Sequence, residues 1–313
     1  MAKRPQVTVL GSLNMDISVT VPRLPGPGMT VLGSAAVFTP GGKGANQAVA
    51  AARLGAEVRM AGCVGDDDFG RQLLAGLRDE GVDAGDVRIA AGVPTGLAMI
   101  SVDGAGENLI TVAPGANHEV GGPEVSSAVS SPRDVLVISA EIPVPAIRAA
   151  LAATRGTRSV LNLAPAPAQA AAVVADGVDW LVVNESEAGA VLGRPVDGLA
   201  DAGRAAAGLV AAGARCAVVT AGAHGAALAS RDSARGEVAS IPAFQVEAVD
   251  TVGAGDTFVG ALAVALAAGM PAPEAVRAAA AAGATAATRH GAQAGLPRPA
   301  DIRAVTGLTW PVA

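Results

Sequence analysis

Aromatic residues, lysine and cysteine are all scarce in this 313-residue chain. Aromatic side chains make up 2% of it and tyrosine is absent, so the core must be built mainly from Ala, Val and Leu. Lysine occurs only at Lys3 and Lys43, and arginine therefore carries nearly all of the positive charge. The two cysteines, Cys63 and Cys216, lack the spacing of metal ligands and are typical of a reducing cytosol.

An excess of positive charge and a long apolar segment are also missing. The net charge is −6 and no basic run occurs, which argues against a nucleic-acid partner. The longest apolar helical stretch, from Phe258 to Met270, ends before Pro271 and is too short to cross a bilayer. The Lys-Arg pair near the start precedes only a short apolar stretch, and Asn14 and Asp16 interrupt the region after it. We therefore expect no signal peptide, no membrane partner and a cytoplasmic location.

The chain is rich in aliphatic residues arranged in short blocks. Hydrophobic residues make up 51% of it, enough to bury a large core rather than remain disordered. Continuous apolar runs alternate with Ala-rich helical stretches, such as 145–154 and 199–212, which is typical of parallel strands covered by helices on both faces. We expect an α/β fold whose central, mostly parallel sheet binds ligands beyond the carboxyl ends of its strands. The buried strands are predicted at 7–11, 135–138, 159–163, 180–183 and 217–220, and two long helices at 254–269 and 273–289.

Strands nearer the start have a different pattern. Residues 17–21 alternate between apolar and polar side chains, and 30–38 resumes an extended pattern after a break rich in Pro and Gly. Residues 97–102 and 109–112 flank the turn Asp103-Gly104-Ala105-Gly106, which indicates a hairpin. These one-sided strands predict a small sheet set apart from the main core. We expect one domain over 1–313 with a discontinuous β lid formed from about 14–38 and 95–113.

Asn14 and Asp16 lie two residues apart, just past the first predicted strand. In an extended chain both side chains point to the same side, where an amide and a carboxylate can bind vicinal hydroxyl groups. An Asx turn that caps the strand would explain the same two residues. On their own they leave both interpretations open.

A Gly-rich segment, Gly41-Gly42-Lys43-Gly44-Ala45-Asn46-Gln47, precedes a helix-forming stretch at 48–54. Glycines let the backbone approach a ligand, and the helix that follows directs free N–H groups back into the loop. Lys43 adds positive charge, and Asn46 adds both a donor and an acceptor. The spacing of a Walker phosphate loop is absent. A Gly-rich turn with a solvated lysine is the alternative, which the scarcity of lysine disfavours.

A second Gly-containing segment, Asp250-Thr251-Val252-Gly253-Ala254-Gly255-Asp256-Thr257-Phe258, leads into a long predicted helix. Gly-Ala-Gly at a helix start exposes several backbone donors, to which an anion can bind. Asp256 falls in the first turn, where its carboxylate can accept a proton from an attacking hydroxyl. An Asp in a first helical turn is also ordinary helix-dipole chemistry, but that does not explain the glycines.

Two weaker signals follow later strands. The carboxylates of Asn184-Glu185-Ser186-Glu187 can organise Mg²⁺ through water, although Asn followed by Glu three residues later also predicts a helix cap. Thr220-Ala221-Gly222-Ala223-His224-Gly225 can line a nucleotide site. The three histidines, His118, His224 and His290, share no metal-ligand spacing and are interpreted as structural or surface residues.

Together and in this order, these motifs resemble the ribokinase-like family of carbohydrate and nucleoside kinases. The resemblance runs from Val7 to about Leu296 and depends mainly on the segments 41–48 and 250–258. Three further features favour the ribose-phosphorylating members of that family: Asn14-Met15-Asp16, then Gly106-Glu107-Asn108 with Gly115-Ala116-Asn117, and Asn162-Leu163-Ala164-Pro165-Ala166-Pro167.

The resemblance implies ATP-dependent phosphorylation of D-ribose at its 5-hydroxyl, with Asp256 as the base. It implies an anion hole for the transferring phosphoryl group at Gly253, Ala254 and Gly255. The implied sugar contacts are Asn14, Asp16, Gly42, Lys43, Asn46, Glu141 and Asp256. The implied nucleotide contacts are Asn184, Thr220, Gly222, Ala223, Gly225 and Gly255.

Two cations and a second copy of the chain are implied in the same way. Glu187 is expected to bind Mg²⁺ through water, and the small sheet is expected to close over the sugar and to pair two subunits as a homodimer. Members of the family commonly carry Ser near the end of the K⁺ loop, where this chain has Gly295. A side-chain oxygen is missing there, so we expect weaker cation binding or a water in its place. The implied ligands of an activating K⁺ are Asp250, Val252, Ala286, Arg289, Gly291 and Gly295.

Three alternatives to a ribose kinase stay open at this point. A kinase of the same family acting on a nucleoside, a deoxyribose or a six-carbon sugar would carry the same motifs. A sugar-binding protein without turnover would keep the sugar site but need not retain the run that ends in Asp256. A dinucleotide-dependent oxidoreductase would suit an α/β sheet, but no Gly-x-Gly-x-x-Gly follows the first strand.

Overall fold

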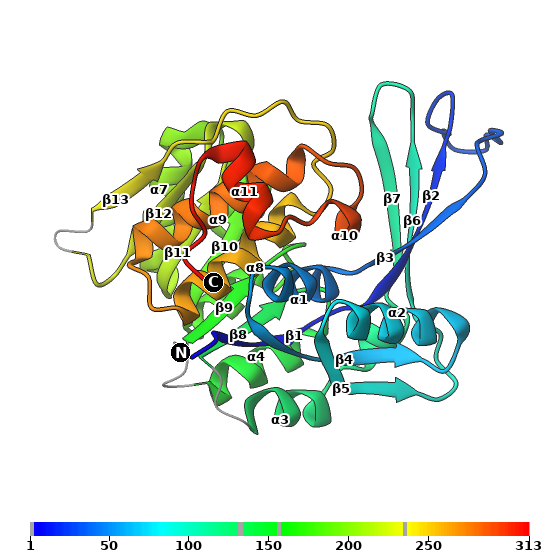
Figure 1. Cartoon of the computed structure of the whole chain (residues 1–313), viewed down its shortest axis with the longest axis horizontal. Helices are drawn as coiled ribbons and strands as arrows, with labels where there is room; N and C mark the ends of the chain where they lie inside the picture. The colour runs from blue at the N-terminus through cyan, green and yellow to red at the C-terminus, as the bar shows by residue number, and fades with distance from the viewer. Residues whose placement is uncertain (1–2, 131–133, 155–157, 234–236, 313) are drawn as a thin grey trace.

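Two separate sheets organise the molecule in the computed structural model, which describes residues 3–130, 134–154, 158–233 and 237–312. A nine-stranded sheet runs through the centre, and a four-stranded sheet projects from one side of it (Figure 1). The strand order is β13-β12-β11-β10-β9-β8-β1-β4-β5 in the large sheet and β3-β2-β6-β7 in the small one.

The large sheet is parallel over most of its width. All neighbours from β5 to β11 pair in parallel, and only β12 and β13, at one edge, pair antiparallel. Its strands are β1 (Gln6–Leu10), β4 (Glu57–Gly65), β5 (Val82–Ala90), β8 (Val135–Ser139), β9 (Arg158–Asn162), β10 (Val178–Asn184), β11 (Ala214–Thr220), β12 (Ala226–Ser230) and β13 (Val238–Ile241).

Helices cover both faces of this sheet, so its central strands are buried on both sides. In β8, Val135 and Val137 pack into one hydrophobic cluster, while Leu136 and Ile138 pack into the other. This two-sided burial explains the continuous apolar runs in the sequence, and it confirms the predicted α/β fold class. One face carries α1 (Lys43–Arg53), α2 (Asp68–Asp79), α8 (Ala254–Ala267), α9 (Ala272–Ala287), α10 (Ala292–Gly295) and α11 (Pro299–Thr306). The other carries α3 (Gly122–Ser130), α4 (Val144–Ala153), α5 (Ala170–Ala175), α6 (Glu185–Leu192) and α7 (Gly198–Ala212).

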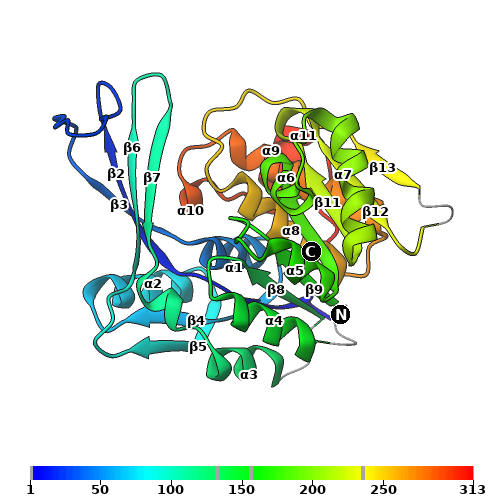
Figure 2. The same ribbon diagram turned by 180° about the vertical axis from the view of Figure 1, so that it is seen from behind.

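The small sheet stands apart from the main body in both ribbon views (Figures 1 and 2). Strand β2 pairs antiparallel with β3 and parallel with β6, and β6 forms an antiparallel hairpin with β7. The predicted hairpin turn is present, because the Asp103 N–H donates to the Glu107 carbonyl at 2.9 Å. The strands are β2 (Asn14–Thr20), β3 (Val37–Gly41), β6 (Gly96–Val102) and β7 (Asn108–Ala113).

The prediction of an extended strand over 30–38 was largely wrong. Only β3 pairs with β2, and residues 30–36 form an exposed connection with no regular structure. Ser34 is bonded to Thr20, at the end of β2: its N–H donates to the Thr20 carbonyl at 2.8 Å, and its hydroxyl oxygen accepts from the Thr20 N–H at 3.1 Å. Hydrogen bonds at this one residue do not make the repeated ladder of a paired strand.

The helices within the described ranges include none that is both long and apolar enough to pass through a bilayer. The cytoplasmic location expected from the sequence stays a prediction. Two short 3₁₀ turns complete the fold, η1 (Gly115–Glu119) and η2 (Gly222–His224).

Candidate active site

Polar residues from distant parts of the sequence meet beyond the carboxyl ends of β1, β8, β9, β10 and β11. They line a cavity of about 340 Å³, and β6 and β7 of the small sheet add an apolar wall that includes Ile100, Ile110 and Val112. Parallel sheets bind ligands at this edge. All seven side chains or backbones predicted to contact a sugar line this one cavity: Asn14, Asp16, Gly42, Lys43, Asn46, Glu141 and Asp256.

Asn14 is held in place from behind by a residue to which the sequence assigned no role. Its Oδ1 accepts a hydrogen bond from Asn117 Nδ2 at 2.7 Å, and Asn117 also bonds both the N–H and the carbonyl of Leu13. Gly42, the N-cap of α1, has a φ of 87°, and a Cβ there would lie 2.6 Å from the Asn14 nitrogen. Only glycine therefore allows the start of α1 to approach β2 this closely.

Lys43 lies among carboxylates in this cavity. Glu141 is anchored by the Ser12 hydroxyl at 2.6 Å and by the Lys43 backbone N–H at 3.1 Å. Burial, reinforced by Glu141 and Asp256, raises the pKa of Asp16 to about 7 against the opposing effect of Lys43. The pKa of the Lys43 ammonium is raised in turn, chiefly by Asp256.

Asp256 lies in the first turn of α8 and is only 8% exposed. Both of its carboxylate oxygens accept hydrogen bonds from side-chain amides: Oδ2 from Asn46 Nδ2 at 2.9 Å, and Oδ1 from Gln47 Nε2 at 3.1 Å. Asn46 Oδ1 is buried and has no hydrogen-bond partner among the described residues, so it can accept from a bound hydroxyl group. The site thus offers a fixed carboxylate next to a free acceptor.

A second cavity, of about 310 Å³, adjoins the first and shares Thr220, Thr251, Gly255 and Phe258 with it. The predicted nucleotide residues Thr220, Gly222, Ala223, Gly225 and Gly255 line this second cavity, whereas Asn184 lines the first. The rest of its wall escaped sequence analysis, because small apolar residues carry no motif. That part of the wall is formed by Ala243, Phe244, Gln245, Val246, Ala248, Ala280, Gly283, Ala284 and Ala287.

The start of α8 lies where the two cavities meet. Gly253 lines the polar cavity, Ala254 lines the second, and Gly255 lines both. The Ala254 N–H already donates to the Thr251 carbonyl at 3.2 Å. A helix N-terminus directs its free N–H groups and the positive end of its dipole toward whatever occupies this junction.

Asn184 and Glu187 form a reciprocal helix cap as well as lining the polar cavity. Asn184 Oδ1 accepts from the Glu187 N–H at 2.9 Å, and Glu187 Oε2 accepts from the Asn184 N–H at 2.9 Å. Burial raises the pKa of Glu187. Within the described ranges, no group of three or more His, Cys, Asp or Glu residues could hold a metal alone. A single carboxylate fits Mg²⁺, which keeps its waters and takes its remaining ligands from phosphates.

The residues predicted to bind K⁺ come together beside the cavity, and only Val252 lines it. Asp250 ties the two loops: its Oδ1 accepts from the Val252 N–H and its Oδ2 from the Gly291 N–H, both at 2.9 Å. The Ala286 carbonyl accepts from the Arg289 N–H, and the Gly291 carbonyl accepts from the Gly295 N–H. A Cβ at Gly295 would lie 3.4 Å from the Arg289 carbonyl oxygen. The Arg289 guanidinium forms an ion pair with Asp301 at 2.7 Å.

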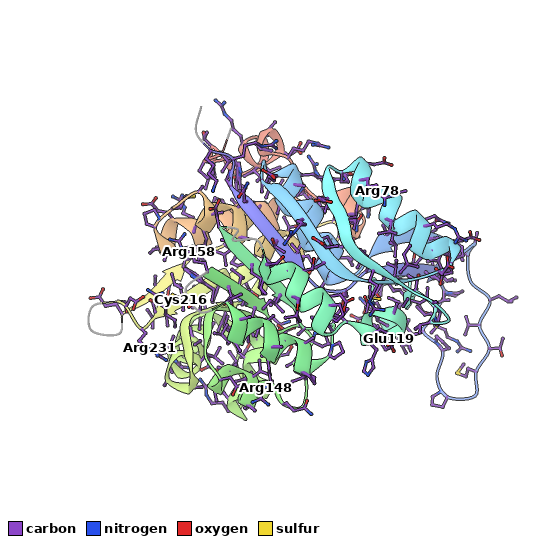
Figure 3. All side chains as sticks on the ribbon, turned by 90° about the horizontal axis from the view of Figure 1, so that it is seen from below. Arg78, Glu119, Arg148, Arg158, Cys216 and Arg231 are labelled. Carbon is purple, nitrogen blue, oxygen red and sulfur yellow. The ribbon has the colours of Figure 1, made fainter. Side chains whose placement is uncertain are left out.

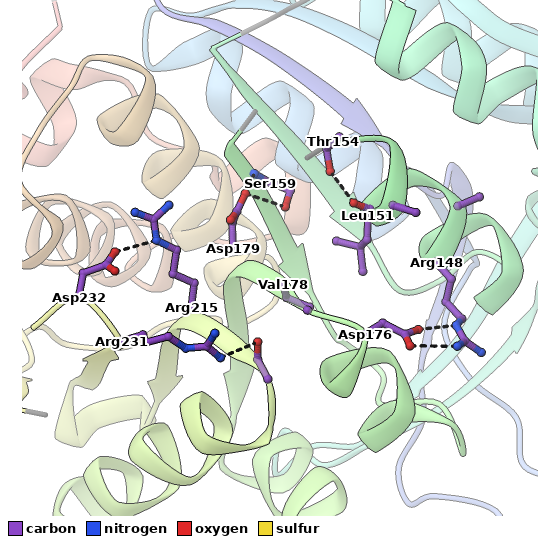
Figure 4. Close-up of a pocket in the computed structure, with 14 residues that line it drawn as sticks. Arg148, Leu151, Thr154, Ser159, Asp176, Val178, Asp179, Arg215, Arg231 and Asp232 are labelled. Carbon is purple, nitrogen blue, oxygen red and sulfur yellow. Dashed lines mark hydrogen bonds and ion pairs between the residues drawn. The ribbon is translucent and has the colours of Figure 1, made fainter. Parts of the chain in front are cut away.

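A larger cavity, of about 910 Å³, lies at the opposite, amino ends of β9, β10 and β11. Its charged side chains are mostly paired, Arg148 with Asp176 and Arg215 with Asp232 (Figure 4). The guanidinium of Arg231 donates to backbone carbonyls, including that of Gly213. Figure 3 labels Arg148 and Arg231, and none of the site residues predicted from the sequence lines this cavity.

Known proteins that are similar to this chain are carbohydrate kinases. The sequence profile of the pfkB carbohydrate kinases matches residues 4–299. The chain belongs to this family, which confirms the resemblance seen in the sequence and makes the protein a carbohydrate kinase. It is 37% identical over 302 residues to a ribokinase from Haemophilus influenzae, covering 94% of this chain and 96% of that protein.

Solved structures of the family have the same fold. Arabidopsis thaliana ribokinase complexed with ribose and ATP is 29% identical, with a TM-score of 0.84 over 98% of this chain and 100% of that one. Phosphofructokinase-2 from Escherichia coli in complex with potassium is 26% identical, with a TM-score of 0.78 over 97% of this chain and 99% of that one.

Proposed function

We propose that this protein transfers the γ-phosphoryl group of ATP to the 5-hydroxyl of D-ribose, with Asp256 as the base. One observation supports this most directly. Asp256 lines the polar cavity and lies in the first turn of α8, whose N-terminus meets the second cavity. The similarity to ribokinases, including one solved with ribose and ATP, supports the choice of substrates.

The chain's own residues supply positioning and charge, which is what phosphoryl transfer chiefly requires. Asn14, Asp16 and the free Oδ1 of Asn46 would orient the sugar hydroxyls. The reacting hydroxyl gives its proton to Asp256, its oxygen forms the new bond to the γ-phosphorus, and the bond to the bridging oxygen breaks with its electron pair leaving on ADP. N–H groups at the start of α8 and the Lys43 ammonium would stabilise the negative charge of the transferring group.

Magnesium fits this site on electrostatic grounds. Four carboxylates, Asp16, Glu141, Glu187 and Asp256, surround the single ammonium of Lys43 in or beside the polar cavity. A polyphosphate entering such a negative field needs a counter-cation. When bound with the nucleotide, Mg²⁺ would supply that charge, and Glu187 would hold it through water.

We further propose an activating K⁺ between the 250 loop and residues 286–295. Asp250 provides negative charge, and Val252, Ala286, Arg289, Gly291 and Gly295 provide backbone oxygens. Since the 250 loop leads directly into α8, a cation there would stabilise the position of the helix N-terminus. The potassium complex of a solved family member supports the proposal for this chain.

The small sheet is proposed to act as a lid and as a dimer contact. Its cavity-facing side chains, among them Ile110 and Val112, would cover the sugar and exclude water. Phe38, Met99 and Leu109 remain 45–53% exposed in the single chain. Exposed apolar side chains on a projecting sheet favour pairing with a second copy. Sedimentation of the purified protein tests this, and a strictly monomeric enzyme would contradict it.

The decisive test is initial-rate measurement of ADP release with ATP and a panel of acceptors. D-ribose is expected to give the highest kcat/KM, and Asp256→Asn serves as the control for enzyme-dependent turnover. The panel includes 2-deoxyribose, a six-carbon sugar and adenosine, which represent the alternative kinases of the family. Preference for any of them over D-ribose would replace the proposed substrate, and tight ribose binding without ADP release would indicate a silent binding protein.

A further inference from the structure

Gln47 contacts the proposed base from behind. Its side chain is completely buried, and it does not line either cavity of the site. Its amide nitrogen uses both hydrogens: one is donated to Asp256 Oδ1 at 3.1 Å and the other to Asn162 Oδ1 at 2.9 Å. Gln47 is therefore a bridge between helix α8 and the end of strand β9.

The orientation of the Gln47 amide is fixed by its two acceptors. Rotating the amide by 180° would direct its oxygen at a carboxylate and at the Asn162 oxygen, neither of which can donate in that arrangement. Asn162 is itself oriented, because its Nδ2 donates to the Val182 carbonyl at 3.3 Å on the neighbouring strand β10. A chain of side chains thus connects the central sheet to one oxygen of Asp256.

Close packing of α1 against α8 makes this contact possible. Gly260 lies one turn after Asp256 in α8, and a Cβ there would lie 2.7 Å from the Gln47 carbonyl oxygen and 2.8 Å from the Ala50 Cβ. Any larger residue would push the two helices apart at the level of Gln47. The base and its rear donor are therefore brought together by the same helix contact.

We propose that Gln47, supported by Asn162, is a positioning residue for phosphoryl transfer. Gln47 would hold Asp256 Oδ1 so that Oδ2, which accepts from Asn46, faces the sugar hydroxyl. This role rests on the proposed function. A rotating carboxylate would present the correct oxygen only part of the time. Near-attack geometry is worth much of the catalytic effect in positioned reactions, so freeing this carboxylate lowers kcat rather than sugar binding.

The expected effect concerns turnover more than affinity. Gln47→Met keeps the length of the side chain and removes both donors. Loss of a hydrogen bond to a charged group predicts a fall in kcat of about tenfold or more, with KM for D-ribose changed by less than about threefold. Lys43, Asp16, Glu141 and Glu187, the other charged groups of this cluster, are retained in the variant.

A matched control separates positioning from loss of stability. Val49 is completely buried on the same helix and lies in the aliphatic core, so Val49→Ala lowers the thermal midpoint without touching the carboxylate. If Val49→Ala and Gln47→Met lose similar stability but only Gln47→Met loses kcat, the positioning role stands. Equal losses of kcat in both variants would overturn it.

A double-mutant cycle with Asp256→Asn gives the second readout, measured in single turnovers at high enzyme concentration. Positioning predicts that Gln47→Met costs less than about twofold once the carboxylate is gone. The same loss in both backgrounds would refute the inference and leave the proposed function intact. Full activity of Asp256→Asn would instead refute the proposed base, so the two failures are distinguishable.

Discussion

The two ends of the parallel sheet carry cavities that differ in size and in charge pairing. The amino end has the larger cavity, about 910 Å³, and its arginines are bonded to aspartates or to backbone carbonyls. The carboxyl end has two smaller cavities, of about 340 and 310 Å³, where Asp16 and Glu187 are partly buried without a directly bonded cation among the described residues and have raised pKa values. Cavity volume therefore does not locate the active site here. Carboxyl groups with raised pKa values do locate it, since functional sites commonly contain ionisable groups with shifted pKa values.

The strongest test of the difference between the two ends of the sheet is to replace one aspartate at each end. Asp256→Asn is expected to lower kcat by roughly 10²–10⁴-fold, the usual loss of a general base. Asp232→Asn, whose carboxylate is paired with Arg215 at the amino end, serves as the matched control and leaves kcat within about twofold. Steady-state rates of the two purified, folded variants decide the matter. A near-normal rate for Asp256→Asn would remove this residue from the mechanism.

Next in expected size is the pH dependence of sugar binding. Asp16 has a raised pKa of about 7, so its carboxylate becomes protonated as the pH falls through 7. A protonated carboxyl is a poorer acceptor for sugar hydroxyls, and the Kd for D-ribose is expected to rise by up to about tenfold per pH unit below 7. Calorimetric titration without nucleotide measures this directly. Asp16→Asn should bind more weakly at pH 8 and lose this pH dependence, whereas an unchanged pH profile in the variant would assign the effect to another group.

The same raised pKa makes the folded protein more stable at low pH, whereas it weakens sugar binding there. The folded protein holds the Asp16 proton more tightly than the unfolded chain does, so the stability contributed by this site is present at low pH and is lost as the pH rises from about 4 to 7. Asp16→Asn should therefore raise the thermal midpoint at pH 8 and leave it nearly unchanged at pH 4. A midpoint difference that is equal at both pH values would contradict the burial of an ionised carboxylate.

A smaller effect is expected at the proposed K⁺ loop. Gly295→Ser would place a hydroxyl next to the Arg289 and His290 carbonyls, since a Cβ there lies 3.3–3.4 Å from both. The concentration of K⁺ that gives half-maximal activation should fall a few-fold, with little change in the rate at saturating K⁺. Gly295→Ala introduces the same Cβ without the oxygen and is the control. Equal responses of the two variants would show that the hydroxyl is not a ligand.

The smallest effect is expected at the amino end itself. The Arg215–Asp232 pair is 58–60% exposed, and such pairs contribute roughly 0–1 kcal/mol to the free energy of unfolding. Arg215→Ala should stay within that range by denaturant unfolding and leave kcat unchanged. A marked fall in kcat would show that the two ends are coupled and would contradict a purely structural role of the amino end.

Most strands that are buried on both sides could be predicted from the sequence, although β4 was missed. Strands such as β8 and β10 read as continuous apolar runs, because both faces of the sheet are covered. Strand β5 was missed as well; it lies at the sheet edge, and its burial pattern over Val82–Ala90 is irregular. Strand β12 did so because its Ala-rich sequence also suits a helix.

Site residues could be predicted where backbone chemistry demands an unusual sequence. Gly42 and the run from Gly253 to Asp256 are conspicuous for that reason, and the structure brings both to one cavity. Asn117 and Gln47 act through other side chains, and Ala284 contributes only a small apolar wall. Asn117 and Gln47 lie in segments that the sequence analysis singled out, but their roles could not be predicted, because those roles arise from contacts between segments far apart in the chain.

The cap that begins helix α6 shares its carboxylate with the cavity. Glu187 closes the first turn of α6 through the Asn184 N–H while facing the proposed place of the nucleotide's cation. A cation held by Glu187 would draw on the carboxylate that closes this helix turn, so nucleotide binding would alter the stability of the start of α6. Amide-proton exchange at Ser186 and Glu187 would report on the loading of the enzyme without any label on its substrates.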